Sequence, residues 1–142
     1  MSVLTTADNR AGIFRQSVES VLAQTFADFE LLIVIDNSAR ETERVLREYR
    51  DPRIRLISAG RSLGVAESRD LGAAAARGEY LAALDGGDLA RPTRLARQVA
   101  FLDSHPDTVL VASGNHDFEL GRMRPGEATG SGPSWLIELL LL

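Results

Sequence analysis

The chain is predicted to form an α/β domain with a mostly parallel sheet and helices on both faces. Apolar runs at residues 31–35 and 80–84 have the length and continuity of buried parallel strands. Segments with apolar residues at helical spacing separate the strand candidates, so that strand and helix alternate along the first hundred or so residues. This alternation is typical of βαβ units with right-handed crossovers, and it predicts the fold class.

Local patterns indicate each element in turn. Phe14, Val18 and Val21 recur at helical spacing, Gly78 is suited to end a helix, and Pro92 is suited to begin one. Strands are expected at residues 2–5, 30–36, 54–57, 80–84 and 109–112, helices at 11–24, 41–49, 65–76 and 92–102, and a loop at 114–132.

Composition bounds the class of protein. The 142 residues suffice for one domain with a core, and 44% hydrophobic with 25% charged residues is typical of a globular protein. The net charge of −4 disfavours a nucleic-acid binder, and the lack of cysteine excludes disulfides and thiolate chemistry. No secretory signal and no bilayer-spanning run are expected.

The expected organisation is a domain at residues 1–113 followed by a tail at 114–142. The tail is rich in loops and ends in an apolar helix, which we expect to begin a second, acceptor-binding half and to offer a contact for homo-oligomers.

Acidic residues follow two of the strand candidates. Asp36 is the last residue of the strand expected at 30–36. Asp85 follows the strand expected at 80–84, and Asp88 lies just beyond it. Ligands of open parallel sheets bind outside the carboxyl ends of the strands, although Asp also caps turns and helices well. The pair at equivalent strand ends favours function.

Two common phosphate-binding loops are missing. No Gly-x-Gly-x-x-Gly follows the first strand, and no Gly-Lys-Ser/Thr loop occurs, so a dinucleotide Rossmann site and a P-loop are disfavoured. Carboxylates can still bind a nucleotide by accepting hydrogen bonds from its base or ribose, or by holding a divalent cation on its diphosphate.

Several blocks of the chain resemble family 2 glycosyltransferases, which have the Rossmann-like GT-A fold. The matching blocks are residues 17–25, 28–31, 51–56, 75–82 and 97–102. The resemblance implies a nucleotide-sugar-dependent enzyme that transfers a sugar from a nucleotide diphosphate to an acceptor hydroxyl. It identifies this chain with the N-terminal, donor-binding half.

The resemblance also implies roles for single residues. Thr6 and Asp8 correspond to the loop that contacts the nucleotide, and Asp36 to the residue that binds the base. Arg69 and Asp85 correspond to residues near the diphosphate, where a guanidinium suits phosphate oxygens.

Residues 85–88 correspond to the metal-binding loop of the family, for which Mg²⁺ or Mn²⁺ is expected. Asp85 and Asp88 are the candidate ligands, but Gly87 stands at the position that usually ligates the metal, and glycine offers no side chain. Asp70 and Asp8 add negative charge near the expected diphosphate, which weakens binding unless a cation or Arg69 compensates.

Alternatives stay open at this point. The chain could be a truncated, non-catalytic module that binds nucleotides or oligomerises, whereas a flavodoxin-like receiver is disfavoured because the first strand ends in Thr5 and Thr6. The catalytic base is expected in a missing C-terminal half. Expected partners are a nucleotide-diphosphate sugar and a saccharide or lipid-linked acceptor, and the expected location is cytoplasmic, with the inner membrane surface as the alternative.

Overall fold

The computed structural model describes residues 1–7, 9–37, 39–114, 116–119, 122–125 and 139–141. Strands and helices alternate in its first part: β1 (Ser2–Thr6), α1 (Ala11–Leu22), β2 (Glu30–Ile35), α2 (Arg40–Leu46), β3 (Ile54–Ser58), α3 (Val65–Ala74), β4 (Tyr80–Ala83) and α4 (Arg94–Ser104). Three strands follow among the described residues: β5 (His116–Glu119), β6 (Arg122–Pro125) and β7 (Leu139–Leu141).

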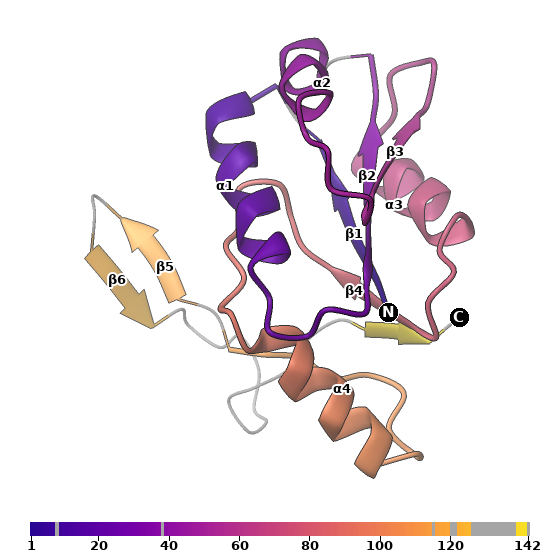
Figure 1. Cartoon of the computed structure of the whole chain (residues 1–142), viewed down its shortest axis with the longest axis vertical. Coiled ribbons are helices and arrows are strands. Elements are labelled where there is room, and N and C mark those ends of the chain that lie inside the picture. Colours follow the sequence, from indigo (N-terminus) through magenta and orange to yellow (C-terminus); the bar gives the residue numbers. More distant parts are fainter. Residues whose placement is uncertain (8, 38, 115, 120–121, 126–138, 142) are drawn as a thin grey trace.

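The main sheet has five strands in the order β3-β2-β1-β4-β7 (Figure 1). The strands β1 to β4 are parallel, and β7 pairs with β4 in the antiparallel direction. From β1 the chain adds β2 and β3 on one side of the sheet and then crosses to add β4 on the other side of β1. This reversal creates a topological switch point between β1 and β4. The predicted α/β class with a mostly parallel sheet is confirmed.

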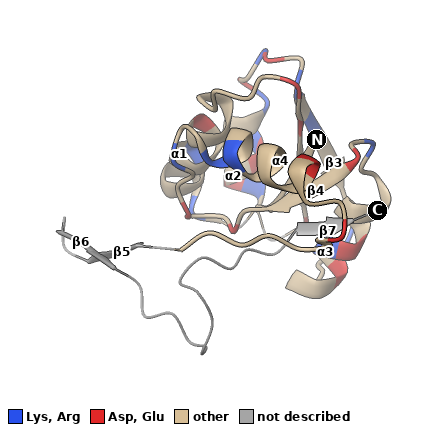
Figure 2. Cartoon of the chain, turned by 90° about the horizontal axis from the view of Figure 1, so that it is seen from below, with Lys and Arg blue, Asp and Glu red and all other residues tan. Residues whose placement is uncertain are grey.

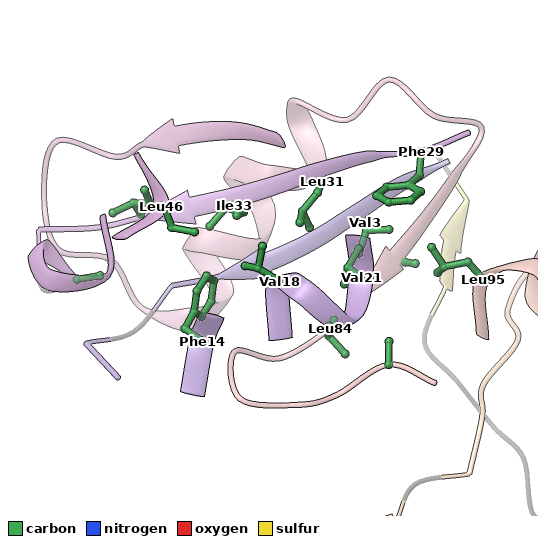
Figure 3. Close-up of a cluster of buried hydrophobic side chains, with 14 of the residues drawn as sticks. Val3, Phe14, Val18, Val21, Phe29, Leu31, Ile33, Leu46, Leu84 and Leu95 are labelled. Carbon is green, nitrogen blue, oxygen red and sulfur yellow. The ribbon is translucent and has the colours of Figure 1, made fainter. Parts of the chain in front are cut away.

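Each face of the sheet is covered by helices, as the continuous apolar runs predict. Val3, Leu31 and Ile33 belong to the larger cluster of buried side chains, which also includes residues of α1, α2 and α4 (Figure 3). Their chain neighbours Leu4 and Leu32 point to the opposite face, where they pack with residues of α3 and the turn after it. Both faces of the central strands are therefore dry, which explains why β1 and β2 show no polar alternation.

Two sequence expectations at the C-terminal side are wrong. Residues 109–112 form no strand beyond an isolated bridge, and Val109 is 68% exposed. Residues 139–141 form β7 rather than part of a helix, because the edge of β4 offers backbone partners and a run of leucines has no period that separates strand from helix. Within the segment expected as loop, β5 and β6 pair as an antiparallel hairpin.

In the view of Figure 2, positions of Lys and Arg and positions of Asp and Glu both occur on the helices and loops of the described part of the chain. None of the helices among the described residues combines the length and the apolar character that crossing a membrane requires.

Candidate functional site

The carboxyl ends of β1, β2 and β4 meet at one edge of the sheet, beside the topological switch point. A hollow of about 300 Å³ opens there, and both Asp36 and Asp85 line it, together with Thr6. The rest of its lining is Ala7, Arg10, Leu63, Val65, Ser68 and Gly86. The structure therefore brings together the two acidic strand ends that the sequence singled out.

Asp36 follows the last residue of β2 and is half-buried. Its Oδ2 accepts a hydrogen bond from the backbone N–H of Leu63 at 3.0 Å, and Asn37 Nδ2 donates to the carbonyl of Gly60 at 3.1 Å. These bonds tie the connection between β3 and α3 to the end of β2. Asp36 thus shapes one wall of the hollow while its carboxylate lines the open space.

Arg69 reaches the site from α3, on the opposite face of the sheet from α1. Its Nη2 donates to Asp85 Oδ1 at 2.5 Å, and the two side chains are 39% and 62% exposed. Both residues line a second hollow of about 90 Å³, which shares Thr6 and Asp85 with the first and also has Asp70 in its wall. Three sequence candidates, Thr6, Arg69 and Asp85, thus surround one spot, whereas Asp8 lies outside the described residues.

The loop after β4 passes close to β1 and α1, and its two glycines have separate structural reasons. A Cβ atom at Gly86 would lie 2.8 Å from the carbonyl oxygen of Thr6 and 3.0 Å from the ring of Phe14, so a side chain does not fit without a shift. Gly87 has φ = 112°, a conformation that L side chains rarely adopt. The family position that usually carries a metal ligand is therefore a backbone turn in this chain.

A row of polar side chains on one side of α1 and just beyond it holds this loop. Ser17 Oγ accepts from the N–H of Gly87 at 2.9 Å, and Ser20 Oγ accepts from the N–H of Ala90 at 3.0 Å. Two residues beyond the end of α1, Gln24 Nε2 donates to the carbonyl of Arg91 at 2.8 Å, and its Oε1 accepts from the N–H of Leu95 at 3.0 Å.

The sequence interpretation missed this row, although it lies inside the matching block at residues 17–25. The signal was available: positions 17, 20 and 24 fall on one side of a helix whose neighbours are apolar, and Ser17 is only 1% exposed. Buried polar groups in such places require hydrogen-bond partners, and here the partners are the backbone of the loop.

A second arginine, Arg94, is close enough to Asp88 for their charges to interact. Arg94, in the first turn of α4, donates from Nη2 to the carbonyl of Ala83 at 2.7 Å. Burial lowers the pKa of Arg94, and the negative charge of Asp88 opposes that shift. Arg94 thus fixes the end of β4 from behind the loop and places a positive charge near Asp88.

These contacts do not fit a divalent cation well. Asp85 is paired with Arg69, the charge of Arg94 interacts with that of Asp88, and Gly87 supplies no ligand. Among the described residues, no group of three or more His, Cys, Asp or Glu side chains is arranged to hold a metal ion. A hard cation such as Mg²⁺ prefers several oxygen ligands, and this loop offers two carboxylates that already have cationic neighbours.

An open α/β sheet with a hollow at its switch point defines a Rossmann-like α/β domain, in which ligands bind at this place. Comparison with known families is more specific: the profile of glycosyl transferase family 2 matches residues 2–138. The chain belongs to this family.

Relatives of the chain carry related descriptions. An uncharacterized glycosyltransferase of Methanocaldococcus jannaschii is 36% identical over 114 residues, which are 78% of this chain and 39% of that protein. The Escherichia coli protein WfaP, a UDP-Glc:α-D-GlcNAc-diphosphoundecaprenol β-1,3-glucosyltransferase, is 30% identical over 119 residues, or 84% of this chain and 47% of WfaP. The chain thus spans less than half the length of these relatives.

Solved structures show the same fold. Residues 1–349 of Staphylococcus aureus TarS in complex with UDP-GlcNAc superpose with a TM-score of 0.74 at 24% identity, covering 88% of this chain and 36% of that one. The mannosyltransferase PcManGT of Pyrobaculum calidifontis, in complex with GDP-Man and Mn²⁺, gives a TM-score of 0.70 at 22% identity, covering 82% of this chain and 35% of that one. The expected GT-A fold is confirmed.

Proposed function

We propose that this chain is the donor-binding domain of a nucleotide-sugar-dependent glycosyltransferase, which transfers a sugar from a nucleotide diphosphate to an acceptor hydroxyl. One observation carries the proposal: Asp36 and Asp85, from the ends of two different strands, line one hollow at the switch point of the sheet. Family membership supports it, and so do the nucleotide sugars named in the descriptions of TarS and PcManGT.

The site residues would divide the donor between them. Asp36 would accept a hydrogen bond from a base N–H or a ribose hydroxyl, because Leu63 N–H already holds one of its oxygens and fixes its orientation. Thr6 and Asp85 would lie beside the diphosphate, with Arg69 donating to phosphate oxygens. Asp8 keeps its proposed contact to the nucleotide as a prediction from the family alone.

For the acceptor, only a chemical class is proposed. The description of WfaP names a lipid-linked diphosphate sugar as its acceptor, which supports a saccharide or lipid-linked acceptor for this family member. We propose that the base which takes the acceptor's proton belongs to the part of the relatives that this chain does not span. Cytoplasmic location, at or away from the inner membrane surface, stays a prediction.

The expected Mg²⁺ or Mn²⁺ at Asp85 and Asp88 also stays a prediction. The Mn²⁺ in the description of PcManGT supports a cation for the fold, whereas the arginine neighbours of both carboxylates in this chain oppose one. A bound metal ion would supply positive charge for the leaving diphosphate, and residues of this chain would have to orient the diphosphate.

The proposed function is tested by calorimetric titration with UDP, GDP and dTDP, each with and without Mn²⁺. We expect one of these nucleotides to bind, and Asp36→Asn to weaken that binding by at least about tenfold, because a hydrogen bond to a charged group is lost. Asp28→Asn, an exposed carboxylate outside both hollows, is the matched control. The absence of heat with all three nucleotides at millimolar concentration would refute the proposal.

A second candidate is a non-catalytic nucleotide-binding or oligomerising module, which Gly87 at the usual ligand position favours. Sugar transfer or donor hydrolysis that disappears in Asp36→Asn would exclude it. The expected oligomer contact through the C-terminal tail has most of its residues outside the described ones, and sedimentation with and without residues 133–142 tests it. An identical monomer in both cases would end that prediction.

A further inference from the structure

Two guanidinium groups approach consecutive residues of the loop after β4. One comes from the residue before α1, and the other comes from α3. Arg10, immediately before α1, donates from Nη2 to the carbonyl of Gly86 at 3.2 Å. Arg69, on α3, donates to the carboxylate of Asp85. Arg10 lines the larger hollow and Arg69 the smaller one, and Asp85 lines both. The arginines therefore flank the same part of the site.

The position of the missing metal ligand lies next to one of these arginines. A Cβ atom at Gly87 would be 3.6 Å from Arg10 Nη2 and 3.5 Å from a methyl group of Ile13. A cation bound at this place would meet a guanidinium at short range, and like charges repel strongly at such distances in a partly buried site. The space that a ligand side chain would use is thus a positively charged one.

Both carboxylates of the loop have a cationic group of the chain in their surroundings. Asp85 pairs with Arg69, and Arg94 lies close enough to Asp88 for the two charges to interact. A bound divalent ion usually neutralises carboxylates as well as phosphates in such loops. Here the carboxylates already have guanidinium neighbours from the chain itself.

We propose that Arg10 and Arg69 bind the diphosphate of the donor in place of a divalent cation, so that this chain binds its nucleotide without metal. The inference rests on the proposed function and concerns the same site. A guanidinium carries five N–H donors in a planar fork, so that Arg69 can keep Asp85 and still donate to phosphate oxygens. Arg10 has the same planar fork, and its bond to the carbonyl of Gly86 places this fork beside the loop.

Calorimetric titration of the full chain with UDP, GDP and dTDP, in excess EDTA and in millimolar Mn²⁺, tests this inference. We expect the dissociation constants in the two buffers to agree within about twofold, and Arg10→Gln and Arg69→Gln each to weaken binding about tenfold in both. Arg69→Lys keeps the charge but loses the fork, and should fall between Arg69→Gln and the native chain.

The matched control is Arg47→Gln, which removes an exposed guanidinium that pairs with Glu43 and lines neither hollow. Urea unfolding of every variant separates loss of binding from loss of folding. Binding that requires Mn²⁺, or tightens more than tenfold with it, overturns the inference and leaves the proposed function intact. Native affinity in both arginine variants also overturns it, and no binding in either buffer overturns both proposals.

Discussion

Gln24 is the residue whose removal should most clearly expose how the loop after β4 is held. It is 6% exposed and sits where the end of α1, the loop and the start of α4 meet. Its amide donates to the carbonyls of Ser20 at 3.1 Å and Arg91 at 2.8 Å, and accepts from the N–H of Leu95 at 3.0 Å. Gln24→Ala deletes these three bonds, together with a longer fourth one to the carbonyl of Ala90 at 3.5 Å, and leaves buried backbone groups without partners from Gln24.

The expected cost follows from these three bonds. Each intramolecular hydrogen bond contributes about 1 kcal/mol net, so the sum is about 3 kcal/mol. Leaving one buried backbone group without a hydrogen bond costs about 1–3 kcal/mol, so this second way of counting gives a loss of stability in the same range. With a urea m-value of about 2 kcal/mol/M for a small domain, the unfolding midpoint should fall by about 1.5 M.

Equilibrium urea unfolding, followed by circular dichroism, measures this shift. Gln16→Ala is the matched control, because Gln16 carries the same side chain on the exposed side of the same helix. We expect the control to change the free energy of unfolding by no more than about 0.5 kcal/mol. If Gln24→Ala costs no more than Gln16→Ala, polar residues of the α1 segment do not anchor the loop and our reasoning about that segment fails.

Two further predictions concern the ends of the sheet. Hydrogen bonds from Ser2, Arg55 and the N–H of Arg77 outweigh the effect of burial and lower the pKa of Glu30, so its stabilising contribution is present above its unfolded pKa of about 4.5 and is lost as the pH falls toward the folded pKa. The urea midpoint should therefore decline less between pH 6 and pH 3 in Glu30→Gln than in the native chain. Parallel declines in the two proteins would contradict this prediction. Gly86→Ala should lower the thermal midpoint because its Cβ would meet the carbonyl of Thr6, whereas Gly12→Ala, with nothing within 4 Å, should raise it slightly; equal shifts would refute the packing reason.

Much of the fold could be predicted from the sequence because its strongest signals are local. Apolar runs and helical spacing placed β1 to β4 and α1 to α4 to within a few residues. The meeting of Asp36 and Asp85 was also predictable, because parallel strands bring their carboxyl ends to one edge. The pairing of β7 with β4 was not, because it joins segments far apart in the chain and leucine runs are compatible with either strand or helix.

The finer structure of the site escaped prediction for a different reason. Hydrophobic periodicity identifies which side of α1 is buried, but it does not identify Ser17 and Gln24 as polar members of that side with backbone partners in another loop. Arg10 had no expected role, since its contact to Gly86 depends on how the chain turns after β1. Sequence spacing can show that polar residues lie on the buried side of a helix, but it does not show which backbone groups they bond to.

Gly87 is more than an absent metal ligand in this structure. Its N–H donates to Ser17 Oγ, so Gly87 is part of how α1 fixes the loop, and its positive φ turns the chain at this point. An aspartate at this position would adopt a strained backbone, and its Cβ would lie 3.6 Å from Arg10 Nη2. Its carboxylate would meet a guanidinium before it met a cation. Because Gly87 and Arg10 lie this close, we expect that Gly87→Asp would form an ion pair with Arg10 in place of a metal site.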